Sequence, residues 1–122
     1  MDYVRDPADG PWTSFDIGAL APARLITDLL PPGYTAAFSL DIAEFPVGGY
    51  SLEHVDAGHA FYIIAGKAEM IIEGEVRAVT TGCVVAIPGG TRHSIRNIGR
   101  EPLVMLTIYD PPRERTSVST KP

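Results

Sequence analysis

The sequence predicts an all-β fold, an antiparallel double-sheet jelly roll or small β-barrel. Its 12 glycines and 11 prolines are spread through 122 residues as punctuation between short apolar runs, which is typical of short strands joined by turns. No segment has the pattern of a helix longer than two or three turns. About eight strands in about 75 residues suit two packed sheets, because that architecture hides strand edges and can enclose a pocket.

We expect a single domain, because a chain of this length supports one hydrophobic core. The barrel is predicted at residues 35–112, after an N-terminal arm with the first short elements at 1–34 and before a flexible tail at 113–122. Residues 19–30 are ambiguous, since their spacing fits one or two helical turns or a strand, and Pro22 argues against a long helix.

Apolar runs bounded by glycine and proline define the strands in order. Residues 46–49 end the first strand, and residues 56–58 form a three-residue turn of hairpin length between the second and the third. Gly66 and Gly74 separate the next ones. The predicted strands are 35–45, 50–55, 59–65, 67–73, 75–79, 82–87, 93–97 and 102–109.

Charge and composition exclude several classes of partner. The formal net charge is −5 and no basic run is present, so we expect neither nucleic acid nor an anionic membrane as a partner. No apolar stretch approaches about eighteen residues, the length that spans a bilayer. Cys83 is the single cysteine, which rules out an intramolecular disulfide. Because the first residues lack a basic region followed by an apolar core, we expect a cytoplasmic protein.

The segment from Gly82 to Asn97 carries the most specific signal. Its pattern, Gly82-x5-Pro88-x-Gly90-x2-His93-x3-Asn97, matches the second motif of the cupin superfamily at every fixed position. Together with the segment before it, the resemblance covers most of the chain. It implies the cupin jelly roll with a site inside the barrel, and it allows a homodimer.

Residues 48–66 resemble the first cupin motif, G-x5-H-x-H-x3-E-x6-G, but with altered ligands. Counted back from Gly66, His59 stands where the family usually has its glutamate. Glu53 falls where the first histidine usually lies, and Val55 where the second does. The resemblance therefore implies a metal site in which Glu53, His59 and one later histidine remain.

The residues themselves can be interpreted in the same way. In a hairpin turning at 56–58, Glu53 and His59 form a diagonal cross-strand pair on the face that also holds Phe61. Because Phe61 is apolar, we expect that face to point inward. A divalent metal ion would fit between Glu53, His59 and His93, and such a ligand set leaves positions open for water, oxygen or substrate. Iron, manganese, nickel and zinc all accept it.

Simpler interpretations stand beside this one. Glu53 and His59 can form a metal-free polar pair, since burial of either without a partner would be costly. His54 lies on the opposite face from Glu53 in this hairpin, so we expect it to be exposed to solvent. Trp12 and Phe15 are unusual in an exposed arm, and we expect them to cover the barrel mouth or pack on a partner subunit.

Several apolar residues are candidates for the lining of a substrate pocket, although each can equally be core filling. Tyr109 shares one face of the last strand with Met105 and Thr107, and its hydroxyl could act at the mouth as a hydrogen-bond donor or proton carrier. The candidate pocket residues are Phe38, Leu40, Val55, Phe61, Met70 and Met105.

Three functions are compatible with these residues. The first is a small enzyme with a divalent metal ion and catalytic residues Glu53, His59, His93 and Tyr109. It would act on a small, partly apolar metabolite by oxygenation, elimination, isomerisation or cyclisation. The second is a metal-free acid/base catalyst such as a dehydratase, cyclase or epimerase. The third is a non-catalytic module that binds a small molecule.

Overall fold

The computed structural model describes residues 4–7, 13–16, 22–26, 29–31, 33–55 and 57–112, and of the side chains in its first two strands only that of Ala23. The described residues form nine strands and almost no helix, which confirms the all-β prediction. The strands are β1 (Thr13–Asp16), β2 (Pro22–Ile26), β3 (Ser39–Phe45), β4 (His59–Ala65), β5 (Lys67–Ile72), β6 (Glu75–Thr80), β7 (Val84–Ile87), β8 (His93–Asn97) and β9 (Leu103–Tyr109).

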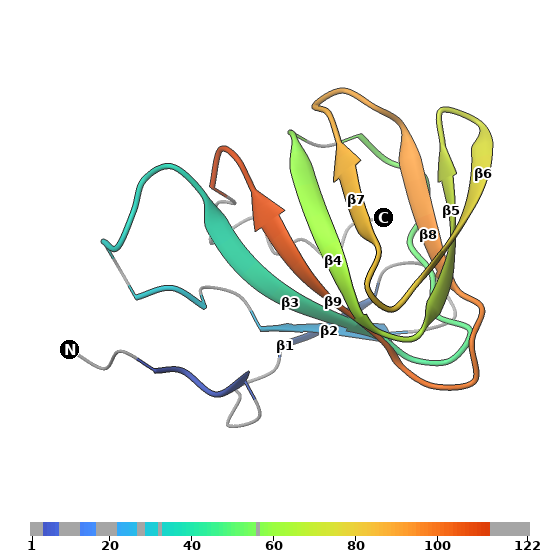
Figure 1. Cartoon of the computed structure of the whole chain (residues 1–122), viewed down its shortest axis with the longest axis horizontal. Helices are drawn as coiled ribbons and strands as arrows, with labels where there is room; N and C mark the ends of the chain where they lie inside the picture. Colours follow the sequence, from blue (N-terminus) through green and yellow to red (C-terminus); the bar gives the residue numbers. More distant parts are fainter. Residues whose placement is uncertain are drawn as a thin grey trace.

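Two antiparallel sheets face each other and form the jelly roll (Figure 1). The large sheet has the order β1-β2-β3-β9-β4-β7, and the small sheet has the order β6-β5-β8. Every predicted strand except 50–55 is present, with ends that differ by four residues at most. None of the described residues belongs to a helix long and apolar enough to cross a bilayer.

Two further strands extend the large sheet toward the N-terminus. β2 pairs with β3, for example through Leu25 and Ala43, and β1 pairs with β2. The structure therefore places a strand within residues 19–30, one of the two alternatives that the sequence left open. β1 lies in the predicted N-terminal arm, where the sequence analysis defines no strand, and its partner is the neighbouring β2.

The other predictions on the arm and tail lie outside the described residues. Trp12 is not described, nor is the segment 113–122, and nothing is described of the Phe15 side chain. Their roles therefore stay predictions.

The predicted strand at 50–55 does not pair with β4. Isolated bridges instead join Tyr50 to Arg96 and His54 to His93, so the segment runs antiparallel along β8. The backbone amides of His54 and His93 each donate to the other's carbonyl oxygen at 3.0 Å. β4 pairs with β9 on one edge and β7 on the other. The hairpin prediction is wrong, because turn length alone cannot reveal that both edges of β4 are taken by distant strands.

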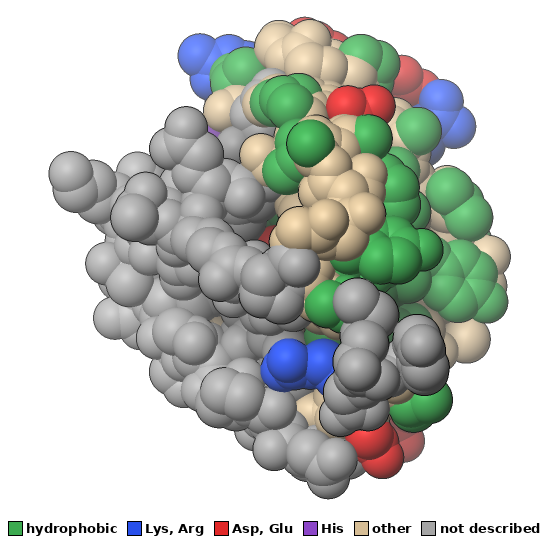
Figure 2. Space-filling view, turned by 90° about the vertical axis from the view of Figure 1, so that its left-hand side faces the viewer, with side chains coloured by type: hydrophobic (Ala, Val, Ile, Leu, Met, Phe, Trp, Pro, Cys, Tyr) green, Lys and Arg blue, Asp and Glu red, His purple; other side chains and the backbone are tan. Residues whose placement is uncertain are grey.

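Exposure alternates along β4 and β7 and identifies the face that points into the barrel. Tyr62, Ile64 and Val84 are exposed, whereas their neighbours Phe61, Ile63 and Val85 are buried. Hydrophobic side chains also lie on the described part of the surface in Figure 2, which is ordinary for a globular protein. The buried core consists of Ala23, Ala43, Phe45, Phe61, Ile63, Ala68, Met70, Val85, Ile87, Ile95, Leu103 and Met105.

Asn97, at the C-terminal end of β8, holds one end of the barrel together. It is 2% exposed. Its side-chain amide donates to the carbonyl oxygens of Phe45 (3.1 Å), Pro46 (3.1 Å) and Glu101 (2.9 Å), and its Oδ1 accepts from the amide of Gly99 (2.9 Å). These bonds connect the loop after β3 with the loop before β9, so this motif residue has a structural role.

Candidate functional site

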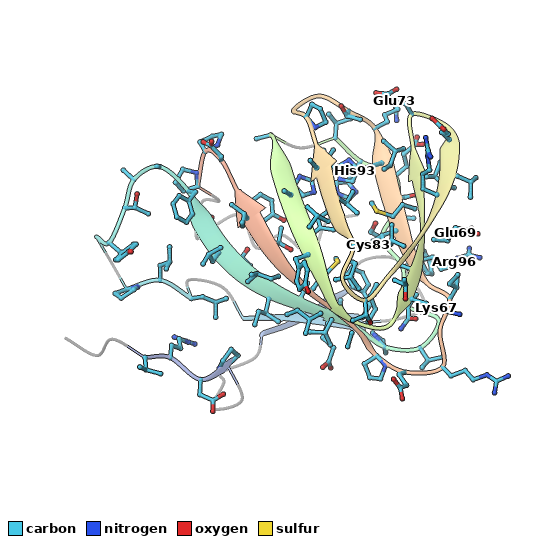
Figure 3. All side chains as sticks on the ribbon, viewed as in Figure 1. Lys67, Glu69, Glu73, Cys83, His93 and Arg96 are labelled. Atoms are coloured by element: carbon cyan, nitrogen blue, oxygen red, sulfur yellow. The ribbon has the colours of Figure 1, made fainter. Side chains whose placement is uncertain are left out.

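Three histidines meet at the other end of the barrel, where β4 and β8 begin. The ring centroids of His54 and His93 are 4.3 Å apart, and those of His59 and His93 are 4.9 Å apart. His59 and His93 are buried, and His54 is half-buried. In Figure 3, His93 projects into the space between the two sheets. We call these three residues the histidine cluster.

The structure exchanges the predicted roles of Glu53 and His54. Glu53 is exposed, and its Oε1 accepts a hydrogen bond from Nη1 of Arg92 at 2.9 Å, so the prediction that it faces the interior is wrong. His54, expected on the surface, lies against His93 instead. The reason is the pairing of this segment with β8: residues directly opposite each other in an antiparallel pair place their side chains on the same face.

A sequence signal for His54 did exist. Counted forward from Gly48, the first motif G-x5-H reaches its first histidine at His54, whereas counting back from Gly66 reaches Glu53. The two counts differ because the segment between the glycines does not have the length of the motif. Asp56, two residues after His54, lies outside the described residues.

The three histidines share one backbone contact that orients their rings. In each, Nδ1 lies within hydrogen-bond distance of the carbonyl oxygen two residues earlier. A carbonyl oxygen can only accept, so Nδ1 carries the proton and donates, and Nε2 keeps the lone pair in the neutral ring. Carbonyl contacts of this kind are the usual support of a metal-binding imidazole. The contacts are His54 to Leu52 (2.7 Å), His59 to Ala57 (3.3 Å) and His93 to Thr91 (2.8 Å).

Tyr109 and Phe61 border the histidine cluster from the large sheet. The Tyr109 ring stacks on His59 with centroids 5.2 Å apart and planes at 24°, and the Phe61 ring lies 5.5 Å from His59. Tyr109 is directly opposite His59 in the pairing of β4 with β9. The structure thus brings together four of the residues that the sequence analysis named as candidates, His59, His93, Tyr109 and Phe61.

Of three other candidate pocket residues, two are buried and one is exposed. Met70 and Met105 are buried in the core cluster. Val55 is 50% exposed, so the prediction that it lines the interior is wrong. The errors for Val55 and Glu53 have the same cause: the predicted hairpin put both residues on the face that holds His59.

β3 is shifted in phase by one residue from the prediction. Leu40 is paired with Ile108, which is 40% exposed on the outer face, so its predicted place in the interior is wrong. Asp41 occupies the inward position instead, opposite the buried Thr107. The apolar residues of β3 hid this phase, since Ile42 on the other face is buried as well. Phe38 precedes the strand and is half-buried.

A described groove of about 290 Å³ lies elsewhere, on the outer face of the small sheet. Tyr50, Glu69, Ser94 and Arg96 are among its lining residues. Figure 3 shows Glu69 and Arg96 projecting away from the barrel interior. This groove is therefore separate from the histidine cluster.

The donor chemistry of the histidine cluster suits a divalent metal ion. Imidazoles that share one ion at a bond length of about 2.1 Å have ring centroids roughly 5 Å apart, close to the observed separations of 4.3 and 4.9 Å. Among the residues that the structure describes, no three His, Cys, Asp or Glu side chains already surround a common point as a metal site requires. The donors thus fit an ion, and binding it would require the rings to reorient.

Comparison with known proteins supports the fold and the family. A model of the cupin domain family (Cupin_2) matches residues 41–109. A cupin 2 domain-containing protein from Halorhodospira halophila is 31% identical, with 76% of this chain and 67% of that one covered and a TM-score of 0.66. A search of curated proteins finds no match.

Two more distant structures share the fold. A predicted oxalate decarboxylase from Thermotoga maritima has 18% identity and a TM-score of 0.78, over 88% of this chain and 97% of that one. The Cnp3 cupin domain from Schizosaccharomyces pombe has 21% identity and a TM-score of 0.64, over 72% of this chain; this chain spans 64% of that one. With the family model matching more than half of its length, the chain belongs to the cupin domain family.

Proposed function

We propose that this cupin is a small enzyme that binds a divalent metal ion through Nε2 of His54, His59 and His93. Its substrate is a small, partly apolar organic molecule with a carbonyl or enol oxygen. The observation that carries the proposal is the shared Nδ1 contact of the three clustered histidines with backbone carbonyls. It leaves the same nitrogen of each ring as the ligand.

The chemistry of the proposed site follows from its surroundings. A bound divalent ion supplies a Lewis acid that polarises a carbonyl or enol oxygen. Phe61 and the apolar core beneath it exclude water and contact the apolar part of the molecule. The Tyr109 side chain, stacked on His59, has a hydroxyl that can donate a hydrogen bond to a substrate oxygen. The similar protein from Thermotoga maritima, described as a predicted oxalate decarboxylase, supports a small oxygen-rich substrate.

Metal content tests the ligand set directly. Tag-free protein is stripped, reloaded separately with Mn²⁺, Fe²⁺, Ni²⁺ or Zn²⁺, and analysed by elemental mass spectrometry. We expect about one ion per chain, lost in each of the variants His54→Ala, His59→Ala and His93→Ala. Glu53→Ala is the matched control and keeps its ion, because Glu53 is paired with Arg92 on the surface. Loss of the ion in Glu53→Ala, with retention in His54→Ala, would contradict the proposed ligands.

A metal-free acid/base catalyst is the second candidate. It is favoured by the buried carboxyl group of Asp41, on the same interior face as Tyr109 and His59. Turnover of small 2-oxo acids and 1,3-diketones, followed by NMR with and without a chelator, separates the two. We expect the chelator to abolish turnover; full activity of metal-free protein would favour the second candidate. A protein that binds these compounds without converting them would instead be a binding module.

A further inference from the structure

Among the acidic side chains that the structure describes, Asp41 is the only buried one, at 2% exposure. The other described acidic side chains are half-buried or exposed. Burying a carboxyl group costs free energy that an apolar side chain of similar size would not cost. A buried carboxyl group beside the apolar core is therefore a candidate for function.

The register of the large sheet places Asp41 beside the histidine cluster. Asp41 pairs with Thr107, and Thr107 pairs with Phe61, so the three side chains share the interior face. The next row toward the barrel end pairs Tyr109 with His59. Successive rows on one face are about 7 Å apart, and Asp41 and Phe61 are two strand spacings, about 10 Å, apart.

This arrangement makes Asp41 and the histidine cluster border one interior region of the barrel, with Asp41 two strands and one row away from His59 on the same sheet. His59 approaches it from β4 and His93 from β8, whereas Asp41 approaches from β3, on the far side of β9. The strand spacings put the backbones of Asp41 and His59 more than about 10 Å apart, and Thr107, Tyr109 and Phe61 share the face between them. A substrate of a few carbon atoms that reaches across this face would have its oxygen near the histidines and its carbon chain toward Asp41.

We propose that Asp41 is the proton-transfer residue of this site. The inference rests on the proposed function, since it takes a carbonyl compound as the substrate. The C–H bond next to the carbonyl group breaks, and its proton forms an O–H bond with a carboxylate oxygen of Asp41. The electron pair of the C–H bond forms a C=C bond while the π pair of the C=O bond moves to the oxygen, which leaves an enolate. The Asp41 carboxyl exchanges its proton with solvent, and transfer of the solvent-derived proton to carbon as the C=O bond re-forms completes the exchange.

Deuterium exchange tests this step without knowledge of the natural substrate. Zinc-loaded full-length protein is incubated in D₂O with pyruvate or 2,4-pentanedione, and loss of the C–H signal is followed by proton NMR. We expect wild-type protein to accelerate exchange of at least one probe and Asp41→Asn to slow it by about 100-fold or more. Zinc content should stay unchanged. Glu44→Gln, on the same strand but the opposite face, is the matched control and should exchange at the wild-type rate.

A second variant separates proton transfer from a structural role. Asp41→Ala should also lose exchange, and added formate should restore part of it by supplying a carboxylate in the space vacated. Formate cannot repair a folding defect, so rescue would support proton transfer even if the variant is less stable. Failure of formate to restore exchange in folded Asp41→Ala would count against it.

The possible results distinguish failure of the Asp41 role from failure of the proposed enzyme function. Wild-type rates in Asp41→Asn would overturn the role of Asp41 and leave the metal enzyme standing. Absence of exchange in zinc-loaded wild-type protein with both probes would overturn the role of Asp41 and the carbonyl substrate together. Loss of zinc in Asp41→Asn would assign the residue to metal binding instead, which also overturns the proposal.

Discussion

The two ends of β8 carry polar residues that are used in different ways. At its C-terminal end, the Asn97 side chain binds the loop after β3 to the loop before β9 through four hydrogen bonds with the backbone. At its N-terminal end, His93 gives one ring nitrogen to a backbone carbonyl, as do His54 and His59. The polar groups of Asn97 therefore all hold the backbone, whereas each histidine uses one ring nitrogen for the backbone and has the other as the proposed metal ligand.

The largest loss of stability should come from a substitution of Asn97, at the C-terminal end of β8. Asn97→Ala removes an amide that satisfies buried backbone groups, and we expect the free energy of unfolding to fall by about 3 kcal/mol or more. Denaturant unfolding of the metal-free protein measures the change. A loss under about 1 kcal/mol would mean that water replaces the amide and that this end is not the structural one.

At the histidine end, a substitution should affect metal binding more than stability. His93→Ala should lower zinc affinity by more than about 100-fold, because it removes a ligand and not merely its support. Titration calorimetry measures the affinity, and denaturant unfolding of the metal-free variant gives its stability. We expect that stability to fall less than in Asn97→Ala. If His93→Ala binds zinc as tightly as wild-type protein does, His93 is not a metal ligand and the proposed site at this end of β8 is wrong.

Two turn glycines extend the comparison to the backbone. Gly66 has φ +104°, and an added Cβ would lie 3.0 Å from Cα of Leu103 and from the Pro102 carbonyl oxygen. Gly74, in the turn near the start of β8, has φ +77° with nothing within 4 Å of an added Cβ. We expect Gly66→Ala to cost about 2–3 kcal/mol and Gly74→Ala about 1 kcal/mol, from strain alone. Equal losses in thermal unfolding would contradict this difference.

The smallest effect concerns the ion pair between Glu53, next to His54, and Arg92, which directly precedes β8. The side chains of Glu53 and Arg92 are 49% and 62% exposed, so Glu53→Gln should change stability by no more than about 1 kcal/mol, and less in high salt. Zinc affinity of this variant, measured in the same titration, should stay within a few-fold of wild type. A much larger loss would make Glu53 part of the metal site.

Local sequence predicted most of the strands and part of the proposed metal site. Glycine and proline mark most strand ends, and the second cupin motif identifies both His93 and Asn97. His59, Phe61 and Tyr109 were also expected, because alternation along β4 and β9 is regular. The errors at the site come from two places: the hairpin expected for residues 50–55, whose true partner is β8, and β3, where apolar residues lie on both faces.

By itself, then, the sequence determined the all-β architecture, its turns and the histidines that begin β4 and β8. Only the tertiary structure decided that His54 and not Glu53 joins them, and that Asp41 and not Leu40 faces the interior. Side chains alternate with a period of two along a strand, so a change of pairing partner or a shift of one residue moves every side chain to the other face. Which strands pair is settled by contacts between distant segments, and no local pattern contains that information.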